Sequence, residues 1–129
     1  MSTITWSRDE LADITEASEL EIEPARDDGS LKDPTTIWVV RDGDDLYVRS
    51  YRGADGSWYR TTQQRHQGRI QAGGVTKDVS LVNVGDDVTL NDRIDAAYHG
   101  KYDRYGAAYV DPMVADTARA TTLKLVPRQ

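Results

Sequence analysis

The chain has 129 residues and a formal net charge of −6, and it contains no cysteine. A chain of this length is typical of one domain, so we expect a single domain over residues 1–129. The missing cysteines exclude disulfides, thiol nucleophiles and thiolate metal sites. Only 25 residues are Leu, Ile or Val, and Phe is absent. This composition predicts a small core, which association with a second copy would stabilise.

The sequence shows no sign of a membrane or targeting segment. No apolar run approaches the roughly 18 residues of a membrane span, and the first residues lack a basic region followed by a hydrophobic one. We therefore predict a cytoplasmic protein without a membrane partner.

The charge is unevenly distributed. Residues 1–45 carry 13 acidic and four basic side chains, a net charge of −9, whereas residues 46–77 carry one acidic and six basic side chains, a net charge of +5. The acidic total argues against nucleic-acid binding. The basic window predicts either a face that attracts a small anion or ordinary solvated arginines that offset the acidic start.

The first elements follow from capping and alternation. Ser7 and Glu10 fit a capping box, so we expect a short helix over residues 8–18. Apolar and acidic residues alternate over residues 20–23, which predicts a half-buried strand.

Two hairpins are predicted in the middle of the chain. The first joins residues 37–40 to residues 45–50 across the Asp42-Gly43 turn, and the second joins residues 69–72 to residues 75–84 across two glycines. Each has β-branched or aromatic residues on both sides of a turn that favours positive φ.

The remaining segments predict helices and a closing strand. Residues 58–64 lack alternation and suit a short helix, and Asn91 or Asp92 can cap a helix over residues 92–105. Pro112 permits a short helix through Ala118, and residues 121–126 form the last strand. Strands and helices do not alternate, so we predict an α+β fold with a small antiparallel β-barrel and short peripheral helices.

The usual catalytic patterns are missing. The sequence has no glycine-rich phosphate loop and no nucleophile elbow. His66 and His99 lie in different predicted elements without an acidic residue at ligand spacing, so we predict no metal site.

A cationic and aromatic cluster is the clearest candidate site. Arg49 and Ser50 end a predicted strand, where a guanidinium and a hydroxyl can hold phosphate oxygens. Trp58 offers a face for stacking on a planar ring, and Arg60 adds a cation. This predicts a small anionic or phosphorylated planar ligand. In the alternative interpretation, Trp58 belongs to the core and Arg49 pairs with an N-terminal acid.

Tyr98 and Lys101 are weaker candidates for catalysis. Three residues apart on a predicted helix, they can point together into a cleft or across a dimer seam, where they would act as proton donors. The alternative is an amphipathic helix whose tyrosines bury their rings and expose their hydroxyls.

Several segments together resemble a known family. Residues 38–50, 56–60, 96–102 and 121–128 resemble the bacterial domain of unknown function numbered 2255, over nearly the whole chain. A looser similarity extends to the FMN-binding split-barrel superfamily, which includes pyridoxamine-phosphate oxidase-like proteins and deazaflavin-dependent reductases. This resemblance implies a homodimer of split barrels with FMN or a deazaflavin at the interface.

The resemblance also implies a flavin- or deazaflavin-dependent oxidoreductase, of unknown substrate. The residues that approach the phosphate of the cofactor would be Arg49, Ser50, Trp58 and Arg60. The chain departs from the deazaflavin enzymes around the tryptophan, where Gly56-Ser57 replaces the usual Pro and Thr61-Thr62 follows in place of Asn. Two other hypotheses stay open: a split barrel that binds a small molecule or partner without a cofactor or turnover, and a cofactor-independent enzyme with a barrel pocket.

Overall fold

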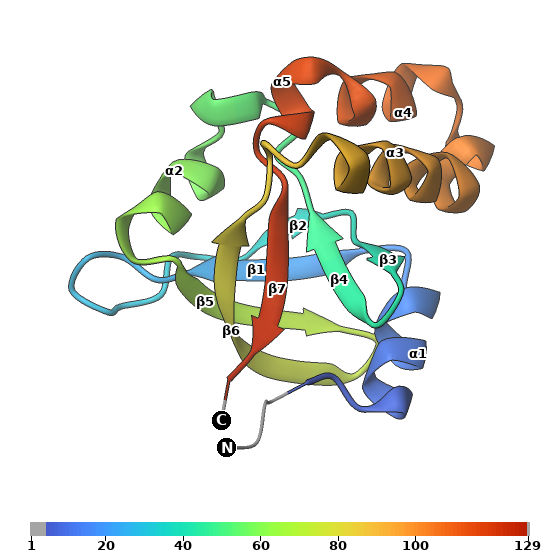
Figure 1. The fold of residues 1–129 in the computed structure, drawn as a ribbon. Helices are drawn as coiled ribbons and strands as arrows, with labels where there is room; N and C mark the ends of the chain where they lie inside the picture. Colours follow the sequence, from blue (N-terminus) through green and yellow to red (C-terminus); the bar gives the residue numbers. More distant parts are fainter. Residues whose placement is uncertain (1–4, 129) are drawn as a thin grey trace.

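The fold is built on one antiparallel sheet that curls into a half-barrel (Figure 1). The computed structural model describes residues 5–128. Within them the sheet has seven strands in the order β2-β1-β5-β6-β7-β4-β3. The strands are β1 (Leu20–Pro24), β2 (Thr35–Ile37), β3 (Val40–Asp42), β4 (Asp45–Val48), β5 (Gln67–Ala72), β6 (Val75–Asn83) and β7 (Leu123–Pro127).

Short helices surround the sheet. They are α1 (Arg8–Glu16), α2 (Ser57–Arg65), α3 (Val88–Tyr102), α4 (Ala107–Val114) and α5 (Asp116–Arg119), with 3₁₀ turns η1 (Gly53–Asp55) and η2 (Asp103–Tyr105). Helices α3, α4 and α5 gather beyond one end of the sheet, at the top of Figure 1. The predicted α+β antiparallel barrel with short peripheral helices is confirmed. Among residues 5–128, no helix is long and apolar enough to span a membrane.

The second hairpin forms as predicted, but the first differs. Ala72 pairs with Val75 across the glycine turn of β5 and β6. The predicted strand 37–40 is divided, because Ile37 pairs with Leu20 of β1 whereas Val40 pairs with Tyr47 of β4.

The side chains between these two pairings explain the break. Trp38 stacks on Tyr102 with ring centroids 3.9 Å apart and planes 1° from parallel. The N–H of Val39 donates to the Tyr102 hydroxyl at 3.1 Å. A tertiary contact with α3 thus turns the chain from one edge of the sheet to the other.

The cap of α1 is the predicted one, whereas α3 has a different capping residue. The Ser7–Glu10 capping box of α1 is confirmed, with the N–H of Glu10 donating to Ser7 Oγ at 3.1 Å. Helix α3 starts earlier than predicted because Asp87, rather than Asn91 or Asp92, caps it and accepts from the N–H of Leu90 at 3.0 Å.

The segment after α3 also differs from the prediction. Pro112 lies inside α4, near its end, rather than in the first turn of a helix. A separate short helix, α5, follows, and Thr121 and Thr122 precede β7 rather than belong to it.

The apolar residues form two clusters on opposite sides of the sheet. The larger one fills the curl of the half-barrel and includes Trp6, Ile14 and Trp58. The second lies where α3 and α4 pack on β3 and β4, and it includes Tyr98 and Met113. Two small cores therefore stabilise the domain.

Candidate functional site

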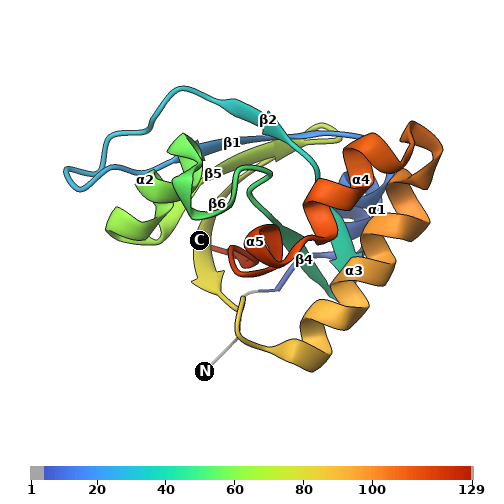
Figure 2. The same ribbon diagram turned by 90° about the horizontal axis from the view of Figure 1, so that it is seen from above.

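A cavity of about 620 Å³ lies where the two cores meet. Four separate stretches of chain line it: residues 32–38 around β2, residues 49–52 after β4, residues 56–58 at the start of α2, and Tyr109 and Met113 of α4. Figure 2 looks onto this region, with β2, α2 and α4 around it. The volume is in the range of small-molecule sites.

At one end of the cavity, the start of α2 presents polar groups without partners. Gly56 is the N-cap residue, and no side chain caps the helix. The hydroxyl of Ser50 is buried without a hydrogen-bond partner. A Cβ on Gly56 would overlap Ser50 Oγ, so the two residues touch. The first N–H groups of a helix have no partner within it, and together with the helix dipole they favour an anion.

Two tryptophans contribute to the cavity wall. Trp58 is 7% exposed, packs in the larger core and also lines the cavity. Trp38 lines the cavity as well and is held by its stack on Tyr102. The two interpretations of Trp58, core residue and ring contact, are therefore compatible.

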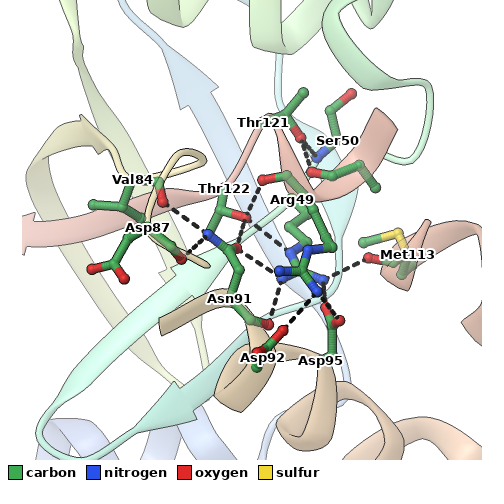
Figure 3. Close-up of polar contacts among 12 residues, drawn as sticks. Arg49, Ser50, Val84, Asp87, Asn91, Asp92, Asp95, Met113, Thr121 and Thr122 are labelled. Atoms are coloured by element: carbon green, nitrogen blue, oxygen red, sulfur yellow. Dashed lines mark hydrogen bonds and ion pairs between the residues drawn. The ribbon is translucent and has the colours of Figure 1, made fainter. Parts of the chain in front are cut away.

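The guanidinium of Arg49 is fully buried and faces the protein (Figure 3). It donates five hydrogen bonds: Nε to Thr122 Oγ1, Nη1 to Asp95 Oδ1 and to the Met113 carbonyl, and Nη2 to the carbonyl and Oδ1 of Asn91. An arginine has five N–H donors, so none is left for a ligand. Arg49 joins β4 to α3, α4 and the chain before β7.

The partner of Arg49 differs from the one expected. It pairs with Asp95 of α3, and not with an acid of the N-terminal segment. Asp95 also accepts from Arg119 Nη1 at 2.7 Å. Because Asp95 is 46 residues from Arg49, no local pattern indicates the pair.

The second predicted cation, Arg60, lies away from the cavity. Its side chain is exposed on α2, and the residue does not line the cavity. The positive charge there comes from Lys32 and Arg52, beside one acid, Asp33. Arg52 belongs to the basic window of the sequence, but Lys32 comes from the acidic part, where charge counting could not find it.

Tyr98 and Lys101 do not meet in a cleft. Tyr98 is fully buried beneath Arg49, whose Cζ lies 5.2 Å from the ring centroid, and burial raises the pKa of its phenol. Lys101 Nζ donates to the carbonyl of Val39 at 2.9 Å. Burial, with a smaller effect of Arg104, lowers the pKa of Lys101 to about 8. Neither residue lines the cavity, so the two side chains do not form a proton-donor pair there.

The histidines lie elsewhere on the molecule. His66 is exposed at the end of α2, with a left-handed φ of 57°, and His99 contacts Asp103 at 2.8 Å on the surface. Within residues 5–128, no group of three or more His, Asp or Glu side chains is placed to hold a metal ion.

Solved structures share this fold. HutZ, the haem storage protein of Vibrio cholerae, superposes with a TM-score of 0.68 at 15% identity, covering 98% of this chain and 92% of HutZ. An FAD-binding protein of Mesorhizobium loti gives 0.63 at 16%, covering 100% and 95%. An F420-H2-dependent reductase gives 0.60 at 13%, covering 84% and 93%.

These identities establish the fold alone. The neighbours are split-barrel proteins of the pyridoxamine-phosphate-oxidase-like kind, so the implied split barrel is confirmed. No curated protein matches the sequence. The family model for uncharacterized proteins conserved in bacteria, DUF2255, matches residues 10–125, and the chain therefore belongs to that family.

Proposed function

We propose that the chain binds a flavin or deazaflavin by its phosphate in the cavity beside Ser50 and serves as an oxidoreductase. One observation carries the proposal: a buried hydroxyl without a partner lies against the uncapped start of α2, inside a cavity walled by two indoles. The FAD-binding and F420-H2-dependent proteins with the same fold support the choice of cofactor class.

The polar end of the cavity fits a phosphate. Ser50 Oγ can donate to one phosphate oxygen, and the N–H groups of Ser57 and Trp58 can donate to others. Gly56 leaves space for the phosphate beside Ser50 Oγ, because the Cβ of any other residue at this position would overlap that oxygen.

The aromatic part of the cavity fits a planar ring. Trp58 is held by the larger core, with Tyr59 packed edge-on at 6.2 Å, and Trp38 is held by Tyr102. Both indoles are therefore positioned before a ligand binds, which lowers the cost of ordering them. The bound cofactor would supply hydride or electron transfer, and the chain would supply binding and orientation.

Arg49 has a positioning role in this proposal. Its five hydrogen bonds hold the end of β4, and the N–H of the next residue, Ser50, donates to Thr121 Oγ1 at 2.9 Å. The serine hydroxyl is thereby kept at the start of α2. Arg60 makes no contribution in this arrangement.

We also propose a homodimer. The core is small, and Val82 and Val88 expose 44% and 67% of their surface, which a second copy would bury. Light scattering at several concentrations tests this, with twice the chain mass expected.

Other hypotheses fit less well. A cofactor-independent mechanism needs Tyr98 and Lys101 in the cavity, and neither lines it. Haem binding through a histidine of this chain needs His66 or His99 there, and neither of these lines it either. A split barrel that binds its ligand without turnover would share the site and differ only in chemistry.

The test compares FMN with riboflavin, which lacks the phosphate, by quenching of tryptophan fluorescence, with a phosphorylated deazaflavin as the third ligand. We expect tighter binding of FMN than of riboflavin. Ser50→Ala removes a charge-assisted hydrogen bond and should weaken FMN binding by about 1.5–3 kcal/mol while leaving riboflavin unchanged.

Thr15→Ala is the matched control, because Thr15 also has a buried hydroxyl without a partner but lies on α1. It should bind FMN as the wild type does. The proposal fails if neither FMN nor the deazaflavin binds, or if Ser50→Ala changes FMN and riboflavin binding equally. Reduction of the bound cofactor by a chemical donor, followed by transfer to an acceptor, separates an oxidoreductase from a binding module.

A further inference from the structure

We infer that the cavity also accepts a planar aromatic substrate with a negative charge, recognised by Tyr51, Tyr109, Arg52 and Lys32. This rests on the proposed function, because it names the substrate class for the same cavity. The four residues are ones that the proposed cofactor contacts do not use.

Tyr51 and Tyr109 are unusually exposed for aromatic residues of this chain. They expose 62% and 64% of their surface, whereas Tyr47, Tyr98 and Tyr102 are buried. Both nevertheless line the cavity, one from the loop after β4 and the other from α4. Two aromatic side chains from separate elements therefore present unburied ring surface to the same space.

Unburied rings at a cavity favour a planar ligand. A flat aromatic molecule can stack on such rings and remove apolar surface from water. Tyrosine suits this role because its ring is rigid, so few conformations are lost when the ligand binds. An aliphatic ring of similar size has no π face, so its binding gains only the free energy of removing apolar surface from water.

The charges at the cavity favour an anion. Arg49 is neutralised by Asp95, but Lys32 and Arg52 form no ion pair among residues 5–128. Asp33 is the one acidic residue of the lining, so these three side chains leave one net positive charge. Arg52 directly follows Tyr51 in the chain, and both residues line the cavity. A carboxylate on the aromatic ligand can pair with the Arg52 guanidinium.

Four small probes separate the two parts of this inference. Benzoate is aromatic and anionic, cyclohexanecarboxylate is anionic only, benzyl alcohol is aromatic and neutral, and benzylamine is aromatic and cationic. Saturation-transfer NMR on the full chain, without cofactor and then with FMN, ranks their affinities. We expect benzoate to bind best and benzylamine to bind worst in both states.

Two variants assign the preference to its residues. Tyr109→Ala should weaken benzoate about fivefold and cyclohexanecarboxylate by a smaller factor, because both lose buried apolar area but only benzoate loses stacking. Arg52→Gln should weaken both carboxylates about tenfold and leave benzyl alcohol unchanged. Arg60→Gln is the matched control, since Arg60 is exposed away from the cavity, and it should change none of the four affinities.

The outcomes distinguish this inference from the cofactor proposal. If FMN binds but benzoate shows no preference over the other three probes, the substrate class is wrong and the cofactor proposal stands. If benzoate binds selectively and FMN does not bind, the cofactor proposal fails alone. If benzoate and FMN displace one another, or if either variant leaves benzoate binding unchanged, the separate aromatic anion site is overturned.

Discussion

The guanidinium of Arg49 and the carboxylate of Asp95 form an ion pair at the junction of the two cores, with the Arg49 side chain fully buried and the Asp95 side chain 21% exposed. The same carboxylate holds Arg119 of α5 through its other oxygen. One aspartate of α3 therefore connects the end of β4 with the segment that leads into β7. This connection fixes the backbone that carries Ser50.

Removal of the Arg49 side chain should strongly destabilise the fold. Arg49→Ala breaks the ion pair with Asp95 and removes a donor from the buried oxygens of Asn91 and Thr122, for which we expect a loss of about 3–5 kcal/mol in urea unfolding. Arg69→Ala is the control. It breaks an ion pair with Asp78 whose side chains are about half exposed, and should cost about 1 kcal/mol or less. Equal losses for the two variants would contradict a structural role for Arg49.

The contact between Gly56 and Ser50 predicts a mutual rescue. Gly56→Ala places a Cβ on Ser50 Oγ and should destabilise the protein by about 1–3 kcal/mol through overpacking. Gly56 has a φ of −61°, so alanine adds no backbone strain. In Gly56→Ala/Ser50→Ala the oxygen is gone, and the next neighbours lie at 3.4 and 3.6 Å, which is ordinary contact.

The double variant should therefore recover most of the lost stability. A double-mutant cycle by chemical unfolding measures the coupling. Additive losses of unfolding free energy would show that the Cβ introduced at position 56 does not touch Ser50 Oγ.

The cap of α3 predicts which aspartate matters for stability. Asp87 Oδ1 accepts from the N–H of Leu90, so Asp87→Ala should lower the free energy of unfolding by about 1 kcal/mol. Asp92→Ala should cost less, because 67% of the Asp92 side chain is exposed where it pairs with Arg119. The reverse order in thermal unfolding would mean that Asp92 caps the helix, which would then start five residues later, at Arg93.

The lowered pKa of Lys101 predicts that the free energy of unfolding depends on pH. Its pKa is about 8 in the folded protein, against the usual 10.5. Between these values the unfolded chain holds more protons, so the free energy of unfolding attributable to Lys101 rises with pH across this window. Above pH 10 the trend reverses, because burial raises the pKa of Tyr47 and of Tyr102 to about 12, and the unfolded chain ionises first.

Urea unfolding at several pH values between 7 and 10 measures this dependence. Lys101→Met should remove the rise between pH 8 and 10, whereas Lys124→Met on β7 should retain it. A profile identical in the wild type and Lys101→Met would contradict the burial of the amine.

Short-range patterns in the sequence determined much of the architecture. The Ser7–Glu10 box predicted the start of α1, and the two glycines after Ala72 predicted the turn between β5 and β6, where Gly73 has a φ of 56°. Such features can be predicted because each depends on residues a few positions apart. The predicted cationic and aromatic cluster likewise contained Ser50 and Trp58, and both line the cavity.

The tertiary structure alone decided which polar groups remain free for a ligand. Arg49 and Ser50 are neighbours in sequence, yet all five donors of the first are bonded to protein and the hydroxyl of the second has no partner. The difference arises from Asp95 and Gly56, which only the packing of α3 and α2 brings to these side chains. A side chain's residue type sets what it can bind, but its partner is the group that folding places within hydrogen-bond distance. That placement depends on contacts between segments far apart in the chain.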